Sequence, residues 1–303
     1  MKLITTVAAL QAQAREWKAE GHPVALVPTM GALHAGHVSL VHAAREARSG
    51  ESAPRVIVSI FVNPLQFGAG EDFERYPRSL EQDLVLLEAA GADAVFNPSV
   101  AEVYPPGFDT SVTVGAVAAS LEGAARPGHF DGVVTAVARL LGAAIADRAF
   151  FGQKDAQQLA VIRRMVTDLA IPAEIVAGPT VREIDGLAMS SRNRYLSLDG
   201  RANALALVRA LAEAQALHLE GVSNIAYIEA AMRGVLEAHA GVRAEYARIV
   251  DPATFETPAA GRPRLAVIAA RVGPARLIDN AALETADLVA LRPAHPGAQA
   301  MAV

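Results

Sequence analysis

The chain has 303 residues, 52% of them hydrophobic, with a net charge of −5 at pH 7 and no lysine- or arginine-rich block, so it can bury a substantial core but lacks the basic surface that nucleic acid requires. Because it contains no cysteine, it cannot form disulfides, thiolate metal sites or a thioester on a protein thiol, and any acyl activation must use a diffusible co-substrate. Its apolar runs are too short to cross a membrane and its first residues lack the apolar core of a signal peptide, which favours a globular cytoplasmic protein with neither nucleic-acid nor membrane partners.

From residue 24 to about residue 179, short apolar runs alternate with longer helical patterns. Strands are predicted at 24–27, 56–62, 94–96, 149–151 and 174–176. Helices are predicted at 38–48, 80–90, 133–145 and 159–169. This alternation is typical of an α/β fold with a doubly wound, Rossmann-like parallel sheet, which binds ligands beyond the carboxyl ends of its strands.

The pattern changes after Asp185-Gly186. Two alanine-rich helical stretches at 199–219 and 224–239 precede three strand-like runs at 245–250, 265–270 and 276–279. We therefore predict a Rossmann-like domain over residues 1–185 and a smaller α+β domain over residues 186–303, which ends in a frayed tail beginning near Pro293.

The segment 28–37, with the sequence PTMGALHAGH, joins the first buried strand to the helix that follows it. Gly31 and Gly36 let the backbone approach a ligand, so that the helix N-terminus can offer free N–H groups to an anion. His34 and His37 lie three apart, on one side of the same turn, where both imidazoles can donate to phosphate oxygens. Two other interpretations stay open: surface histidines at a helix cap, and zinc binding, for which no second Cys or His cluster supplies ligands.

Two other segments combine charge with a strand end or a loop. In the segment 150–158, FFGQKDAQQ, Lys154 can face a phosphate, and Asp155 can either cap the helix or bond a ribose hydroxyl. In the segment 189–192, MSSR, two hydroxyls and a guanidinium on a flexible loop can close over phosphates. A solvated helix start and an ordinary polar linker are the alternative interpretations.

Amide and acidic side chains supply weaker signals. Gln66 and Gln158 offer both donor and acceptor atoms, which suits a small substrate that carries hydroxyls beside a carboxylate. Glu122 and Arg126 are spaced as an ion pair on a helix surface. The acidic segment 71–78 could help to hold Mg²⁺, although such runs are usually solvated loops.

Together, these motifs resemble the pantothenate synthetase (pantoate–β-alanine ligase) family of the nucleotidyltransferase superfamily, which shares an H-x-G-H-type motif with class I aminoacyl-tRNA synthetases. The resemblance covers about two-thirds of the chain, in order through the segments 28–37, 59–68, 76–78, 121–130, 152–158, 179–183 and 192–196. It implies that ATP, pantoate and β-alanine give pantothenate, AMP and diphosphate through a pantoyl-adenylate, with Mg²⁺ as cofactor and a homodimer as the assembly. The first domain then binds nucleotide and pantoate, and the second acts as a lid.

The resemblance also implies a role for individual residues. The residues implied to bind ATP are Met30, Gly31, Ala32, Leu33, His34, Ala35, Gly36, His37, Gly152, Gln153, Lys154, Asp155, Val181, Met189, Ser190, Ser191 and Arg192. Those implied to be catalytic are His34, His37, Lys154 and Arg192, with His37 as the proton donor. Gln66 and Gln158 are implied to hold pantoate, and Gln66 also lies near β-alanine.

Three positions depart from the family pattern. Gln153 stands where the family usually has Glu, and Ala156 where an aromatic residue is common. Gln82 replaces an acid found in some relatives, which leaves Asp83 as the candidate protein ligand to Mg²⁺.

Two rival functions remain. An adenylyltransferase that attacks ATP with a phosphate would need a second basic pocket where this chain has Gln66 and Gln158. A regulatory nucleotide-binding module would need backbone amides more than it needs the side-chain donors His34, His37, Lys154 and Arg192.

Overall fold

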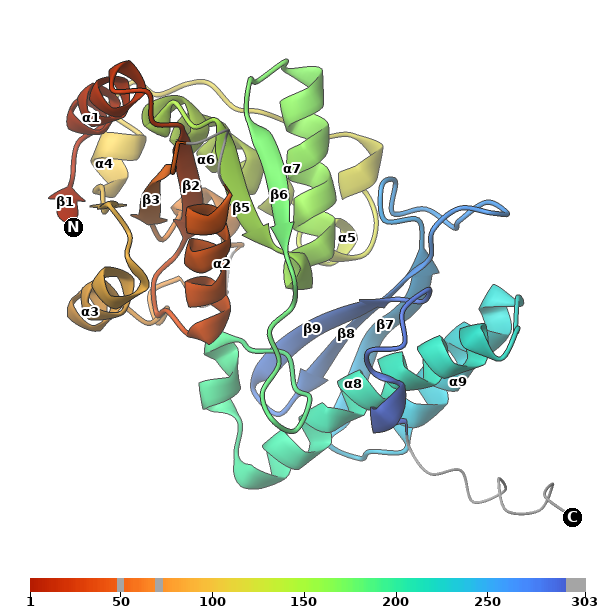
Figure 1. Cartoon of the computed structure of the whole chain (residues 1–303). Coiled ribbons are helices and arrows are strands. Elements are labelled where there is room, and N and C mark those ends of the chain that lie inside the picture. Colours follow the sequence, from red (N-terminus) through yellow and green to blue (C-terminus); the bar gives the residue numbers. More distant parts are fainter. Residues whose placement is uncertain (48–51, 69–72, 293–303) are drawn as a thin grey trace, which may run out of the picture. The chain divides into compact units, whose positions relative to one another are not determined.

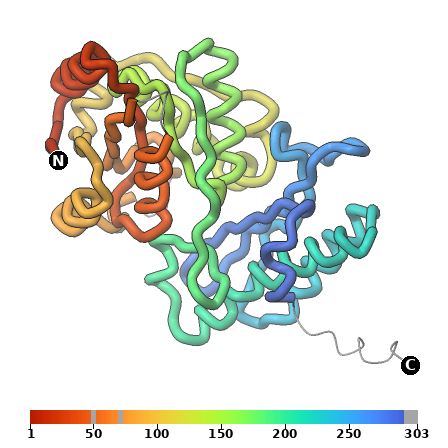
Figure 2. The backbone as a smooth tube through the Cα atoms, in the orientation of Figure 1, coloured from red at the N-terminus to blue at the C-terminus, as the bar shows by residue number. Residues whose placement is uncertain are grey.

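The computed structural model describes residues 1–47, 52–68 and 73–292. The chain forms two compact units, Met1–Val181 and a second that starts at Arg182 (Figures 1 and 2). The sequence placed this division after residue 185, whereas the observed contacts place it four residues earlier, at Val181. The predicted tail from Pro293, the end of the predicted helix 38–48, and Glu71 and Asp72 of the acidic segment lie outside the described residues.

The first unit contains a six-stranded, fully parallel sheet in the order β1-β4-β3-β2-β5-β6. The strands are β1 (Lys2–Ile4), β2 (Val24–Thr29), β3 (Arg55–Ile60), β4 (Ala94–Phe96), β5 (Arg148–Gly152) and β6 (Glu174–Gly178). The helices are α1 (Val7–Ala19), α2 (Ala35–Glu46), α3 (Leu80–Ala90), α4 (Val100–Val103), α5 (Glu122–Ala125), α6 (His129–Ala144) and α7 (Ala156–Asp168). Short 3-10 turns lie at η1 (Pro64–Gln66), η2 (Ala116–Ala118) and η3 (Gln153–Asp155).

Helices cover the sheet because its central strands are buried on both faces. Ala25 and Val27 of β2 belong to the apolar core that α2 and α3 share. The alternate residues Val24 and Leu26 are equally buried and point to the opposite face. Helix α6 packs against β2, α1 and α7, and Figure 1 shows α2 lying along the strands in front of the sheet.

The strand order places the candidate ligand site beyond the carboxyl ends of the central strands β2 and β5. From β2 the chain winds outward through β3 and β4, and it then returns to the other side of β2 to form β5 and β6. The order therefore reverses between β2 and β5, and open α/β sheets bind ligands at such a reversal, beyond the carboxyl ends of the strands. The segments that follow β2 and β5 hold His34, His37 and Lys154.

The second unit is a smaller α+β structure. Its antiparallel sheet has the order β7-β8-β9 and consists of β7 (Val242–Val250), β8 (Leu265–Val272) and β9 (Ala275–Ala282). Its helices are α8 (Leu198–Leu219) and α9 (Ile225–Glu237), with 3-10 turns η4 (Ser191–Tyr195) and η5 (Val289–Leu291). Leu207, Leu211, Ile228, Met232 and Ile268 form the centre of its core. These observations confirm the predicted fold class.

None of the helices in the described ranges is both long and apolar enough to cross a membrane.

Candidate active site

A tight turn joins β2 to α2 and carries the two histidines of the candidate site. Gly31 has φ +83° and Ala32 has φ +51°, so two successive residues adopt the left-handed conformation. A Cβ on Gly31 would lie 3.1 Å from Asp83 Oδ2 and 3.1 Å from Ile60 Cγ2, which adds a steric reason for glycine here. Helix α2 then begins at Ala35, with His34 as its N-cap.

Backbone N–H groups in this turn already donate to side chains of the protein. The Gly31 N–H donates to Thr29 Oγ1 over 3.3 Å. The Ala32 N–H donates to Asp83 Oδ2 over 2.9 Å, and the Leu33 N–H donates to Asp83 Oδ1 over 2.8 Å. These three N–H groups precede α2 and already have internal acceptors. At the helix N-terminus, where free N–H groups were predicted, the Gly36 N–H donates to His34 Nδ1.

Backbone donors fix the tautomers of both imidazoles. His34 Nδ1 accepts the Gly36 N–H over 3.2 Å, and His37 Nδ1 accepts the His34 N–H over 3.3 Å. Since an accepting Nδ1 carries no proton, the neutral form of each ring has its hydrogen on Nε2. The two ring centroids lie 4.1 Å apart. The two histidines thus form a reciprocal capping box at the start of α2, while the donation of their rings to phosphates stays a prediction.

His37 is a neutral imidazole at physiological pH. Burial, and to a lesser degree charge repulsion from His34 and Lys154, lowers its pKa to about 3. Lys154, in η3 after β5, therefore lies within electrostatic reach of His37. No three side chains of His, Asp or Glu in the described ranges lie where they could share a metal ion.

Asp83 occupies a different place from that of a metal ligand. It lies in the first turn of α3, its side chain is buried with 1% of the residue exposed, and both oxygens accept backbone N–H groups of the β2–α2 turn. Ser79 Oγ also donates to its Oδ1 over 3.3 Å. These three donors occupy most of the acceptor sites of the carboxylate, which argues against the suggestion that Asp83 binds Mg²⁺.

Gln66 ends the 3-10 turn η1, and its neighbours hold both its amide and its backbone. Asn63 Nδ2 donates to Gln66 Oε1 over 3.1 Å, and Gln66 Nε2 lies 3.0 Å from Met30 Sδ. The buried Asn63 is itself fixed by the Tyr104 hydroxyl, which donates to Asn63 Oδ1 over 2.8 Å. Burial raises the pKa of Tyr104 to about 12, so its hydroxyl stays protonated as a donor.

The Gln66 carbonyl accepts from Arg126, which follows α5, and from His129, the first residue of α6. His129 Nδ1 lies 2.8 Å from this oxygen, and Arg126 donates to it over 3.3 Å. The Arg126 guanidinium also lies 2.8 Å from His129 Nε2, so His129 accepts at Nε2 and donates from Nδ1. The predicted surface position of Glu122 is wrong, because Glu122, the first residue of α5, is only 7% exposed.

In the segment after β5, Asp155 stands at the N-cap of α7. Its side chain makes no capping hydrogen bond, so the cap interpretation fails.

Gln157 in the same segment is a residue that the sequence reasoning missed. The buried Gln157 donates to the carbonyls of Val117 and Ser120 over 3.0 and 2.8 Å and accepts the Glu122 N–H over 3.0 Å. Gln158, the predicted substrate ligand, follows on α7 and is partly exposed.

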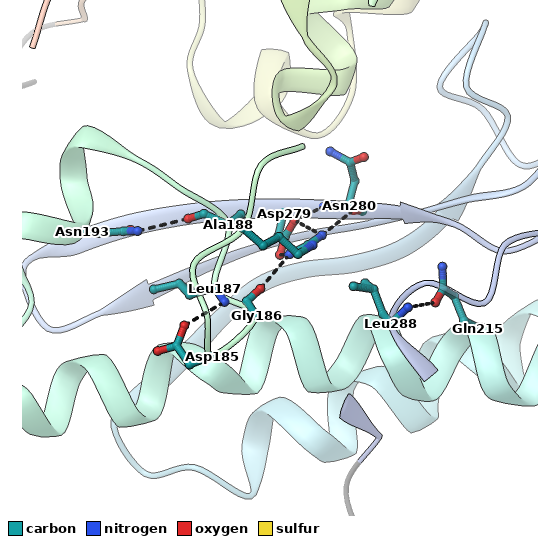
Figure 3. A network of polar contacts seen from close by, with 10 residues as sticks. Asp185, Gly186, Leu187, Ala188, Asn193, Gln215, Asp279, Asn280 and Leu288 are labelled. Carbon is teal, nitrogen blue, oxygen red and sulfur yellow. Dashed lines mark hydrogen bonds and ion pairs between the residues drawn. The ribbon is translucent and has the colours of Figure 1, made fainter. Parts of the chain in front are cut away.

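The predicted loop Met189–Arg192 belongs to the second unit and is anchored at its base (Figure 3). Arg182 pairs with Asp279 on β9 through two contacts of 2.7 and 3.0 Å, and it also donates to the Gly186 carbonyl. Asn193 donates to the Ala188 carbonyl over 3.1 Å. Ser190 Oγ caps η4 by accepting the Arg192 N–H over 3.3 Å. The base of the loop is thus a bonded part of the second unit rather than a free linker.

Known proteins match this chain over nearly its whole length. The sequence profile described as pantoate-beta-alanine ligase matches residues 2–282. The pantothenate synthetase of Roseiflexus sp. (strain RS-1) is 51% identical over 94% of this chain and 100% of its own length.

Two solved structures extend the comparison to the fold. The pantothenate synthetase of Thermus thermophilus has a TM-score of 0.84 and 48% identity over 93% of this chain and 99% of that one. The pantoate-beta-alanine ligase of Francisella tularensis, solved with beta-gamma ATP and beta-alanine, has a TM-score of 0.74 and 30% identity over 94% of this chain and 98% of that one.

Proposed function

The chain belongs to the pantoate–β-alanine ligase family, and from that premise we propose how its residues divide the work of the reaction. The enzyme condenses (R)-pantoate with β-alanine, consuming ATP and releasing AMP and diphosphate through a pantoyl-adenylate, in the biosynthesis of pantothenate and coenzyme A. The pantoate carboxylate attacks the α-phosphorus, and the β-alanine amine then attacks the activated carbonyl. Neither step requires a protein nucleophile, so the residues must position the substrates and stabilise charge.

His34 and His37 act as hydrogen-bond donors to the phosphates of ATP in this proposal. The observation that carries it is the pair of Nδ1 atoms that both accept backbone N–H groups, which puts the proton of each neutral ring on Nε2. With a pKa of about 3, the His37 ring does not bind a second proton at pH 7. In the free enzyme it can therefore donate a hydrogen bond but does not act as an acid. Bound polyphosphate would favour the cation, because a nearby negative charge raises a histidine pKa.

Lys154 places a compact positive charge beside the same phosphates, and Asp155 bonds the ribose. The Asp155 side chain makes no capping hydrogen bond to α7, so the structural alternative to a ribose contact is not formed, which supports this role. Gln66 and Gln158 hold pantoate, and Gln66 also contacts β-alanine. The fixed amide of Gln66 supports a positioning task.

The rest of the nucleotide site consists of Met30–His37, Gly152–Asp155, Val181 and Met189–Arg192, with Ser190, Ser191 and Arg192 at the phosphates and the second unit as a lid. The roles proposed for Met189–Arg192 and for the second unit rest on the resemblance to the pantoate–β-alanine ligase family.

Mg²⁺, a homodimer and a cytoplasmic location complete the proposal. Among the described residues no three His, Asp or Glu side chains form a metal-binding group, and Asp83 is engaged by backbone N–H groups. We therefore infer that Mg²⁺ arrives with ATP, held mainly by phosphate oxygens and water, as is common for nucleotide enzymes.

The reaction is tested by product analysis with labelled substrate. The enzyme is incubated with Mg·ATP and pantoate carrying ¹⁸O in its carboxylate, with and without β-alanine, while AMP, ADP and diphosphate are followed. An adenylate transfers one ¹⁸O to AMP and releases diphosphate. ADP as the nucleotide product would refute the adenylate mechanism.

The role of the imidazoles is tested by substitution. We expect His37→Ala to lower turnover by about two to three orders of magnitude with the fold intact, the scale of a positioned donor. The matched control is His42→Ala, because His42 lies on the same helix and is exposed. Wild-type turnover in His37→Ala would remove His37 from the mechanism.

A further inference from the structure

Asp83 connects α3 to the histidine-bearing turn, although the two segments lie about 50 positions apart in the chain. Its two carboxylate oxygens accept the N–H groups of two successive residues, Ala32 and Leu33, over 2.9 and 2.8 Å. At 1% exposure, water cannot replace this carboxylate as an acceptor. The next N–H along the chain, that of His34, donates to His37 Nδ1.

These two hydrogen bonds stabilise a backbone that local preference opposes. Ala32 adopts φ +51°, a conformation that side chains with a Cβ rarely adopt and that persists where surrounding contacts fix it. The carboxylate supplies those contacts on the C-terminal side of Gly31. Without it, the turn loses two charge-assisted bonds at once, and the direction of the His34 N–H is no longer fixed.

We propose that Asp83 is a positioning residue of the nucleotide site, which sets the β2–α2 turn so that His34 and His37 direct their Nε2–H groups to the phosphates. This inference rests on the proposed function of the two histidines. Asp83 acts through the backbone and touches neither nucleotide nor metal.

The test is Asp83→Asn, which keeps the side-chain shape but turns one acceptor into an amide donor that faces a backbone N–H. We expect the KM for ATP to rise about tenfold or more and kcat to fall, while the KM for pantoate changes less than twofold. The matched control is Asp93→Asn. Asp93 also accepts a backbone N–H, that of Val56 over 2.8 Å, at the amino end of the same sheet.

A second readout separates positioning from stability. Nitrogen-15 NMR of the nucleotide-free protein should show Nε2–H tautomers for His34 and His37 in the wild type and in Asp93→Asn. In Asp83→Asn we expect mixed tautomers and a His37 pKa closer to about 6.5. This readout needs no turnover, so it reports on Asp83 even if the assigned role of the histidines fails in the His37→Ala experiment.

Each remaining outcome decides the inference. If Asp83→Asn does not fold, Ser79→Ala decides, because it removes only the hydroxyl that bonds the same carboxylate. A raised KM for ATP in Ser79→Ala then supports the proposal, and an unchanged value overturns it. Equal kinetics and equal imidazole signals in Asp83→Asn and Asp93→Asn would also overturn it. If excess Mg²⁺ restored the kcat and the KM for ATP of Asp83→Asn, Asp83 would be a metal ligand instead.

Discussion

The neutral state of His37 predicts a specific loss of stability in acid. An unfolded histidine has a pKa of about 6.5, whereas burial, with His34 and Lys154 nearby, lowers the pKa of His37 to about 3. Above about pH 6.5 both states are neutral and this site contributes no pH dependence. Below this pH the unfolded state binds a proton that the folded state does not bind. The free energy of unfolding therefore falls by about 1.4 kcal/mol per pH unit until about pH 3.

Between pH 7.5 and pH 5 the titration of His37 alone should therefore lower the free energy of unfolding by about 2 kcal/mol. The figure hardly depends on the native pKa provided that it lies below about 4, because the folded state then binds almost no proton at pH 5. Trp17, the only tryptophan of the chain, is buried on α1 in the same unit and supplies a fluorescence signal for its unfolding.

The assay is urea unfolding at pH 7.5 and at pH 5, followed through Trp17 in the wild type and in His37→Gln. Glutamine cannot titrate, so the variant should lose about 2 kcal/mol less than the wild type between the two pH values. The comparison within each protein cancels the direct cost of the substitution. Equal losses in the two proteins would refute a neutral His37 in the folded state.

Three further predictions concern contacts around the site. Tyr104→Phe removes the hydroxyl that fixes Asn63, and we expect kcat/KM for pantoate to fall about threefold to tenfold while the KM for ATP is unchanged, as steady-state kinetics can measure. Gln66→Ala should weaken pantoate and β-alanine but keep ATP binding, and unchanged pantoate affinity in calorimetry would count against the assignment. Arg182→Ala leaves the carboxylate of Asp279, a residue only 3% exposed, without its bidentate partner, so thermal or urea unfolding should show a loss of about 3 to 5 kcal/mol.

Local patterns predicted several elements of this fold closely, but they missed β1, α1, α4 and α5. The helix α3 and the strand β4 begin and end at the predicted residues. Both are bounded by turn or breaker signals, and each has an apolar pattern long enough for its type. Helix α6 begins at His129, four residues before its predicted start at Val133, because Gly128 with φ +79° starts the helix without a side-chain cap that a sequence pattern would reveal.

The supports of the site could not be predicted in the same way, because they depend on pairs of residues that are distant in the chain. Asn63 was visible as a polar residue after a buried strand, but its partner Tyr104 lies 41 positions away. Gln157 carries no signal in the sequence, because only the fold brings it to the carbonyls of Val117 and Ser120. A buried amide with several possible bonds has no local signature when its partners belong to another loop.

The glycines at the β2–α2 junction act differently from what their pattern predicted. The pattern indicated a backbone that approaches an anion, yet the N–H groups of Gly31 and Gly36 donate to Thr29 and His34 inside the chain. Their N–H groups serve the geometry of the turn, and the imidazole Nε2–H groups are the donors of the proposed site. A site of this kind differs from a backbone nest because each donor can be removed singly by substitution. Loss of one histidine should then be expressed mainly in the transition state, since Asp83 still holds the preceding turn through the Ala32 and Leu33 N–H groups.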